Sequence, residues 1–165
     1  MTENNNKLGR KPISELKRLT DKEVDYLYRK YVKSSKPKDL RIKKVIVNAL
    51  ITRGGYNCDK KEYAAAISKL TKAIKLDPTC ADAYCNRGNI HFKQKNYAKA
   101  ITDHTREIEL NPSDIDWAYL RRGVDYWLKG DLELTLADFT KALKIKPDNK
   151  EARRYLNKLT GVNTG

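Results

Sequence analysis

A pattern about 34 residues long repeats three times and accounts for most of the chain. In each copy an Arg-Gly pair is followed, 24 residues after the glycine, by a proline, and several columns between them stay in register. Self-similarity at a fixed period of this size is typical of stacked-repeat architectures. The columns in register are Arg53-Gly54, Arg87-Gly88 and Arg122-Gly123; Tyr63, Tyr97 and Leu132; Ala66, Ala100 and Thr135; Ile74, Ile108 and Leu143; and Pro78, Pro112 and Pro147.

Each copy reads as a pair of helices. The middle copy, residues 81–114, holds two apolar-periodic runs separated by a polar turn around Lys95–Asn96. A glycine inside a helix costs about 0.5–1 kcal/mol relative to alanine, so a glycine in the same column of all three copies indicates close packing of the paired helices. The proline ends the second helix, because it cannot continue the hydrogen-bond ladder. One such unit cannot bury its apolar face alone, so we expect the three to stack and to need caps at both ends.

These columns resemble those of the tetratricopeptide-repeat (TPR) family, whose 34-residue helix-turn-helix unit carries a large residue, then Gly, aromatic, Ala and Pro positions. The resemblance covers about residues 47–149 and implies an all-α fold. It predicts a right-handed helical solenoid of three TPR units with extra N-terminal helices and a C-terminal capping helix. In the middle unit, Glu107 departs from the usual Ala. The matching positions are Leu50, Gly54, Asn57, Tyr63, Ala66, Leu70, Ala73 and Pro78 in unit one, Tyr84, Gly88, His91, Tyr97, Ala100, His104 and Pro112 in unit two, and Tyr119, Gly123, Tyr126, Leu132, Thr135, Phe139, Ala142 and Pro147 in unit three.

The pattern also predicts the organisation of the chain. Residues 1–37 form a basic extension with one or two helices, disordered over about the first 11 residues; a short helix is expected at 13–19 and a second opens at the capping box Thr20–Glu23 and ends at 34–37. Residues 38–149 hold the three units, at about 47–80, 81–114 and 116–149, and residues 150–165 form a capping helix and tail, with Asp148 expected as its N-cap. The expected helices are a long one from about Lys38 into the first unit, then 61–76, 80–93, 97–110, 115–129, 132–146 and 149–159.

Composition and charge limit the cellular compartment and the classes of partner that we expect. No apolar run approaches the roughly 18–20 residues of a membrane span, and the N-terminus lacks the apolar core of a secretory signal. Three cysteines form no disulfide framework, so we expect a cytoplasmic protein. The net charge of +14 favours acidic partners: a nucleic-acid backbone, an anionic membrane surface or an acidic peptide. Residues 1–46 carry 14 Lys and Arg against 6 Asp and Glu, so a nucleic-acid-associated factor using this segment is the alternative hypothesis; a solvated basic face is the favoured interpretation of this charge.

The sequence offers little for catalysis. It has no phosphate-binding glycine loop, nucleophile elbow or paired zinc-binding helix motif, so we expect no enzyme, no metal and no cofactor. His91 and His104 occupy the aromatic columns of the middle unit and should face each other across its two helices. They could instead ligate a metal with a cysteine, but the spacing of Cys80 and Cys85 is not a usual zinc pattern, so packing is the favoured interpretation.

A second recurring pair joins the two helices of a unit. Arg87 with Asp103 and Arg122 with Asp138 recur at equal spacing, which predicts an ion pair between the helices. The first unit has Lys69 at the acidic position.

The resemblance implies where a partner would bind, because the first helix of each TPR unit lines a concave face that typically holds a peptide or a helix. The third unit is the most telling, since two tryptophans beside leucine and valine would form an apolar contact patch of the kind that marks binding sites. The alternative is that the chain's own terminal segments cover this patch. The candidate partner-binding residues are Asn86, Asn89, Phe92, Lys93, Trp117, Leu120, Arg121, Val124 and Trp127.

Some TPR proteins hold acidic chaperone C-termini with a clamp of Lys, Asn, Asn, Lys and Arg. Only Asn86 and Arg121 match here, whereas the other columns hold Ile51, Gly55 and Trp117, which argues against a co-chaperone role of that type. The sequence therefore predicts a non-catalytic protein–protein interaction module or adaptor that binds a peptide or helix in its concave groove.

Overall fold

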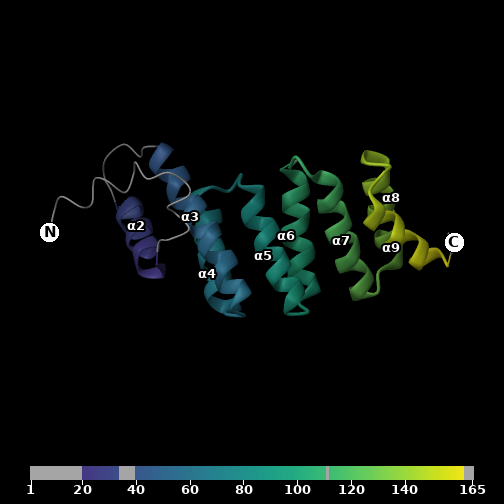
Figure 1. Ribbon diagram of the computed structural model, residues 1–165, viewed down its shortest axis with the longest axis horizontal. Coiled ribbons are helices and arrows are strands. Elements are labelled where there is room, and N and C mark those ends of the chain that lie inside the picture. Colours follow the sequence, from purple (N-terminus) through teal and green to yellow (C-terminus); the bar gives the residue numbers. More distant parts are fainter. Residues whose placement is uncertain (1–19, 34–39, 111, 162–165) are drawn as a thin grey trace. The chain divides into compact units, whose positions relative to one another are not determined.

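The computed structural model describes residues 20–33, 40–110 and 112–161, and within these residues it contains eight α-helices and no strand (Figure 1). The expected disorder at the N-terminus, the short helix at 13–19, the end of the next helix at 34–37 and the tail after 161 lie outside the described residues, as does much of the basic segment 1–46. The helices are α2 (Asp21–Lys33), α3 (Leu40–Asp59), α4 (Tyr63–Leu76), α5 (Ala81–Lys93), α6 (Tyr97–Glu109), α7 (Ile115–Lys129), α8 (Leu132–Ile145) and α9 (Lys150–Thr160). These bounds confirm the predicted helical repeats to within about two residues at most ends.

The chain divides into two compact units, Met1–Asn86 and Arg87–Gly165, with the division inside α5. The N-terminal unit contains α2, α3, α4 and the first residues of α5. The C-terminal unit contains the rest of α5 and α6 to α9. Each unit is described by itself.

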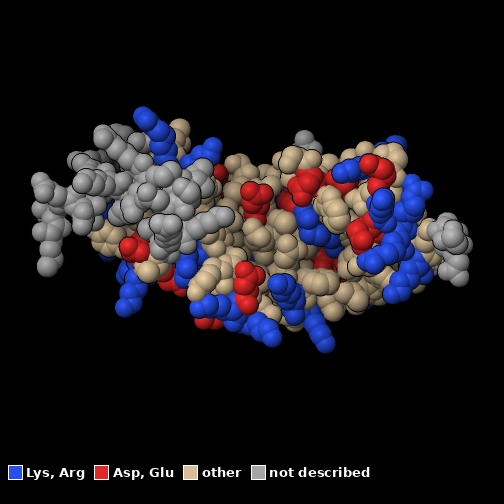
Figure 2. Space-filling model, in the orientation of Figure 1, with Lys and Arg blue, Asp and Glu red and all other residues tan. Residues whose placement is uncertain are grey.

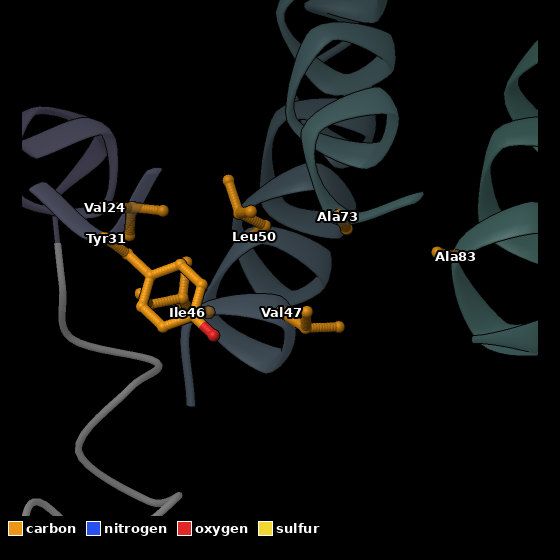
Figure 3. Packing of buried hydrophobic residues seen from close by; sticks show 8 residues of the cluster. Val24, Tyr31, Ile46, Val47, Leu50, Ala73 and Ala83 are labelled. Carbon is orange, nitrogen blue, oxygen red and sulfur yellow. The ribbon is translucent and has the colours of Figure 1, made fainter. Parts of the chain in front are cut away.

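In the N-terminal unit α2 packs on the first repeat and supplies one of the two expected caps. The capping box forms, since the Thr20 backbone N–H donates to Glu23 Oε2 at 2.7 Å and the Glu23 N–H donates to Thr20 Oγ1 at 3.4 Å. The two buried apolar side chains of α2, Val24 and Tyr31, belong to the same cluster as Ile46 and Leu50 of α3 (Figure 3). By packing there, α2 shields the apolar surface of the first repeat from water, as a capping helix of a repeat array does.

The same helix supplies the carboxylates that the first repeat lacks. Asp21 Oδ1 lies 2.7 Å from Arg53 Nε, and Asp25 accepts bonds from Lys69 Nζ at 2.8 Å and Lys72 Nζ at 2.6 Å. Partial burial raises the pKa of Asp25, but the hydrogen bonds and charges of the two lysines outweigh it and hold the pKa below its usual value. Lys69 therefore has an acidic partner after all, in α2 rather than in its own unit.

In the C-terminal unit the recurring glycines mark close helix contacts, as predicted. A Cβ on Gly88 would lie 2.6 Å from His104 Nε2, and one on Gly123 would lie 2.7 Å from Phe139 Cε1. Both distances are well inside van der Waals contact, so only glycine lets these helices approach so closely.

The predicted ion pairs between paired helices are confirmed. Arg87 donates to both oxygens of Asp103, at 2.8 and 2.7 Å, and Arg122 does the same to Asp138, at 2.8 Å for each bond. Both aspartates are buried, and a bidentate guanidinium–carboxylate pair fixes geometry as well as charge.

The capping helix α9 forms, but its predicted N-cap was wrong by one residue. Asn149, not Asp148, accepts from the Ala152 N–H at 3.0 Å, and its amide also donates to Asp116 Oδ2 at 2.8 Å. An amide is needed there because the side chain must accept one bond and donate another while buried, which a carboxylate cannot do. The apolar face of α9 packs on α7 and α8 through Ala152, Tyr155, Leu156 and Leu159. Its other face exposes Lys150, Arg153, Arg154 and Lys158, and Figure 2 shows basic side chains gathered at this end of the chain.

Candidate partner-binding site

A hollow of about 210 Å³ opens in the C-terminal unit. Half of its ten lining residues are apolar or aromatic and half are polar or charged, and apolar atoms make up most of the wall. Cavities that hold drug-sized ligands are commonly about 300–1,000 Å³, whereas an apolar cavity of about 150 Å³ is enough for benzene. The hollow therefore has room for one or two side chains. Its lining comprises Asn89, Phe92, His104, Trp117, Leu120, Arg121, Val124, Asp125, Glu151 and Tyr155.

Six of the nine candidate residues line this hollow. Asn89 and Phe92 come from α5, and Trp117, Leu120, Arg121 and Val124 come from α7, where a spacing of three or four residues places them on one side of the helix. The remaining three do not line it. Asn86 belongs to the N-terminal unit, Lys93 is exposed at the end of α5, and Trp127 lies under α9.

The two tryptophans, expected as one patch, have different surroundings. Trp127 packs edge-on against Tyr155 with ring centroids 5.8 Å apart, and Lys158 Nζ lies 5.3 Å from its ring centroid. Trp117 is 39% exposed and lines the hollow. The predicted patch is therefore only partly covered: α9 packs over Trp127 and leaves Trp117 exposed.

Arg121, the arginine of the predicted groove, is already engaged. Its Nη2 donates to Glu107, which is only 2% exposed, and lies 3.5 Å from Asp114 Oδ2. Removing the arginine from this pair would leave a buried carboxylate without its counter-charge, at a cost of about 3–5 kcal/mol. The pair also explains why Glu107 replaces the usual Ala of its column.

The base of the hollow holds a second buried polar pair. His104 Nδ1 and Asp125 Oδ2 lie 2.6 Å apart, and the two side chains are 1% and 0% exposed. Burial raises the pKa of Asp125, and the bond with His104 offsets this rise only in part. His91 Nε2 lies 4.0 Å from Asp103 Oδ2, and the expectation that His91 faces His104 stays a prediction. Desolvation lowers the pKa of His91.

Sequence reasoning did not assign four residues of the lining to a site. Glu151 and Tyr155 were placed in the capping helix, and His104 was interpreted as a packing residue. Asp125 had one available signal, since it is an acidic residue between Val124 and Tyr126 on the apolar side of α7. An acid at such a position needs a buried partner.

Two further properties concern the described residues. Nowhere in them do three His, Cys, Asp or Glu side chains gather in a group able to hold a metal ion. None of the helices between residues 20 and 161, as far as they are described, has the length and apolar character needed to cross a membrane.

Comparison with known families identifies the architecture. The family model described as "TPR repeat" matches residues 57–95, and models described as "Tetratricopeptide repeat" match residues 81–114 and 118–149. Together the matches cover more than half of the chain; the second and third follow the pairs α5–α6 and α7–α8, and the first runs from the end of α3 through α4 and α5. The chain belongs to the TPR family. No curated protein sequence matches the chain.

Solved TPR structures similar to this TPR chain include peptide complexes. The second TPR domain of human RPAP3, in complex with an HSP70 peptide, is 30% identical over 67% of this chain and 92% of that domain, with a TM-score of 0.63. The first TPR of Spaghetti (RPAP3), bound to an HSP90 peptide, is 29% identical over 70% of this chain and 90% of that one, with a TM-score of 0.65. The Arabidopsis OM64 TPR domain is 28% identical over 70% and 94%, with a TM-score of 0.65. These relatives support a protein-interaction module.

Proposed function

We propose that this TPR protein is a non-catalytic adaptor that binds a peptide or helix of a partner protein by seating an anchor side chain of the partner in the hollow of the C-terminal unit. The observation that carries the proposal is the hollow itself, where Trp117, Phe92, Leu120 and Val124 surround a space the size of a side chain. Aromatic anchors in desolvated pockets supply most of the affinity of protein interfaces. The family supports the same reading, since two similar TPR domains hold peptides.

The mode of binding we propose differs from the carboxylate clamp of some TPR proteins. The peptides bound by the two similar domains, SRMEEVD and SGPTIEEVD, are acidic at their C-terminal ends. In this chain the clamp columns hold Ile51, Gly55 and Trp117, and Arg121 is occupied by Glu107. We therefore propose recognition through an apolar anchor rather than through a terminal carboxylate held by Arg121.

A selection from a random 12-residue peptide display library, with the full chain as bait, tests the proposal. The affinity of each enriched peptide would be measured by fluorescence anisotropy against the wild type and against Trp117→Ala. Loss of an anchor contact costs about 2 kcal/mol, so we expect binding about 30-fold weaker in the variant, with unchanged helicity by circular dichroism.

The matched control is Lys93→Ala, which truncates an exposed candidate residue that does not line the hollow and should leave affinity unchanged. The proposal fails if no enriched peptide depends on Trp117, or if Lys93→Ala weakens binding as much as Trp117→Ala does.

A further inference from the structure

We infer that the partner segment is acidic, and that its carboxylates bind a stripe of basic side chains on α9 beside the hollow while its apolar anchor enters the hollow. This inference rests on the proposed function and names the chemistry of the partner. The stripe consists of Lys150, Arg154 and Lys158, and we call it the α9 stripe.

The α9 stripe is continuous with the wall of the hollow. Its members are spaced four residues apart, so they lie one above another on one side of the helix. Glu151 and Tyr155, which line the hollow, each follow a stripe residue by one position, about 100° around the helix axis. Contacts agree with this placement, since Arg154 Cζ lies 5.3 Å from the ring centroid of Tyr155.

The stripe residues are accessible to a partner. All three are exposed, and the Arg154 side chain is 68% exposed. Arg154 pairs with Glu151 at 2.6 Å, but an exposed pair within one helix turn is weak, so a partner's carboxylate can share this guanidinium. Arg121 differs in this respect, because the buried Glu107 holds it. Of the two arginines beside the hollow, Arg154 of α9 is therefore the one that can bind a partner's carboxylate.

Charge around the stripe favours an anionic partner. Residues 141–160 contain Lys or Arg at 141, 144, 146, 150, 153, 154 and 158, against acids only at 148 and 151. Figure 2 shows the resulting concentration of basic side chains at this end of the chain. Such an excess attracts acidic segments before contact and speeds their association.

The size and lining of the hollow favour a peptide over a nucleic acid as the anionic partner. Nucleic-acid surfaces combine basic grooves with exposed aromatic platforms on which successive bases stack. Here one exposed tryptophan borders a small hollow walled also by Leu120 and Val124, which suits a single aliphatic or aromatic side chain. An acidic peptide with one large apolar residue fits both features.

The α9 helix offers a matched pair of charge reversals that test the inference. Lys150→Glu reverses a stripe residue, and Arg153→Glu makes a reversal of the same sign at an exposed residue that lies outside the stripe, on the side of the helix away from Glu151 and Tyr155. Each changes the net charge of the chain to the same extent. Peptides enriched on the wild-type chain would be titrated against both variants in about 0.02 M and about 0.5 M salt, together with a fluorescein-labelled 12-nucleotide oligoadenylate.

We expect the enriched peptides to carry several Asp or Glu beside one large apolar residue. Their binding should fall by about fivefold in Lys150→Glu at low salt, change little in Arg153→Glu, and weaken as salt rises. Equal effects of the two reversals would mean that only net charge matters, which overturns the inference. Tighter binding of the oligonucleotide than of any peptide, with the same dependence on Lys150, also overturns it.

The inference and the proposed function fail in different ways. Enriched peptides that need Trp117 but lack acidic residues would overturn the inference and leave the proposed function standing. A selection without any Trp117-dependent peptide would overturn the proposed function and with it the inference.

Discussion

Gly88→Ala should destabilise the C-terminal unit even though alanine is the better helix former. A Cβ at this position would lie 2.6 Å from His104 Nε2, about 0.8 Å closer than the 3.4 Å at which ordinary contact begins. The imidazole cannot easily turn away, because it is 1% exposed and its Nδ1 is bonded to Asp125 at 2.6 Å. The added methyl group must therefore distort the helix pair or break that bond.

Whether Gly88→Ala stabilises or destabilises the unit depends on two opposing contributions, helix propensity and overpacking. Replacing a helical glycine by alanine contributes about 1 kcal/mol of stability. Overpacking of a filled core costs about 1–3 kcal/mol, and a bond to a charged group adds about 1.5–3 kcal/mol if it is lost. We expect the free energy of unfolding to fall by about 1–3 kcal/mol.

Urea denaturation followed by tryptophan fluorescence reports on the unfolding of the C-terminal unit, because both tryptophans of the chain, Trp117 and Trp127, lie in it. Gly55→Ala is the matched control: Gly55 is also in a helix, but a Cβ there would meet nothing within 4 Å. Circular dichroism should show this variant to be more stable by about 0.5–1 kcal/mol. If Gly88→Ala proved as stable as the wild type, the close contact with His104 would not be what requires glycine.

Three further perturbations test the ring under α9, the ion pairs made by α2 and the ion pair between α7 and α8. Trp127→Ala should lower the free energy of unfolding by about 1–3 kcal/mol in urea titrations because it removes the ring under α9, whereas Trp117→Ala should cost less than about 1 kcal/mol. Asp25 has a lowered pKa, so its ion pairs stabilise the fold above the usual pKa of about 3.8 and this contribution is lost as pH falls through the lowered value. Asp25→Asn should therefore reduce the loss of stability between about pH 5 and pH 2, and an identical acid profile for both proteins would contradict this. Asp138→Ala leaves Arg122 unpaired and should cost about 3 kcal/mol, whereas Glu151→Ala breaks only an exposed pair and should cost less than about 1 kcal/mol, both measured by thermal melting.

Much of the fold could be predicted because it repeats. The Arg87–Asp103 pair was predictable since the same residues recur one unit later, and helix ends followed from capping residues and prolines. The buried pairs that join α6 to α7 had no such signal. His104 with Asp125, and Glu107 with Arg121, each occur once, at separations of 21 and 14 residues, so no periodicity reveals them.

The candidate site was predictable only in part, for a related reason. Helical spacing placed Trp117, Leu120, Arg121 and Val124 on one face of α7. It could not say how far along that face α9 would reach, because this depends on the angle at which α9 packs. The contact of Tyr155 with Trp127 settles that extent, and sequence reasoning had assigned both tryptophans to one surface.

The first unit differs from the other two because its Arg53 and Lys69 pair with Asp21 and Asp25 of α2 and not with a carboxylate of the same unit. Its cations Arg53, Lys69 and Lys72 depend on the carboxylates of α2, so the first unit would lack these counter-charges at any other place in the array. The second and third units each contain both members of the recurring ion pair, Arg87 with Asp103 and Arg122 with Asp138, so a duplicate of either would keep that pair. A copy of the first unit inserted after another repeat would lack the carboxylates of α2, and its unpaired cations would destabilise the protein.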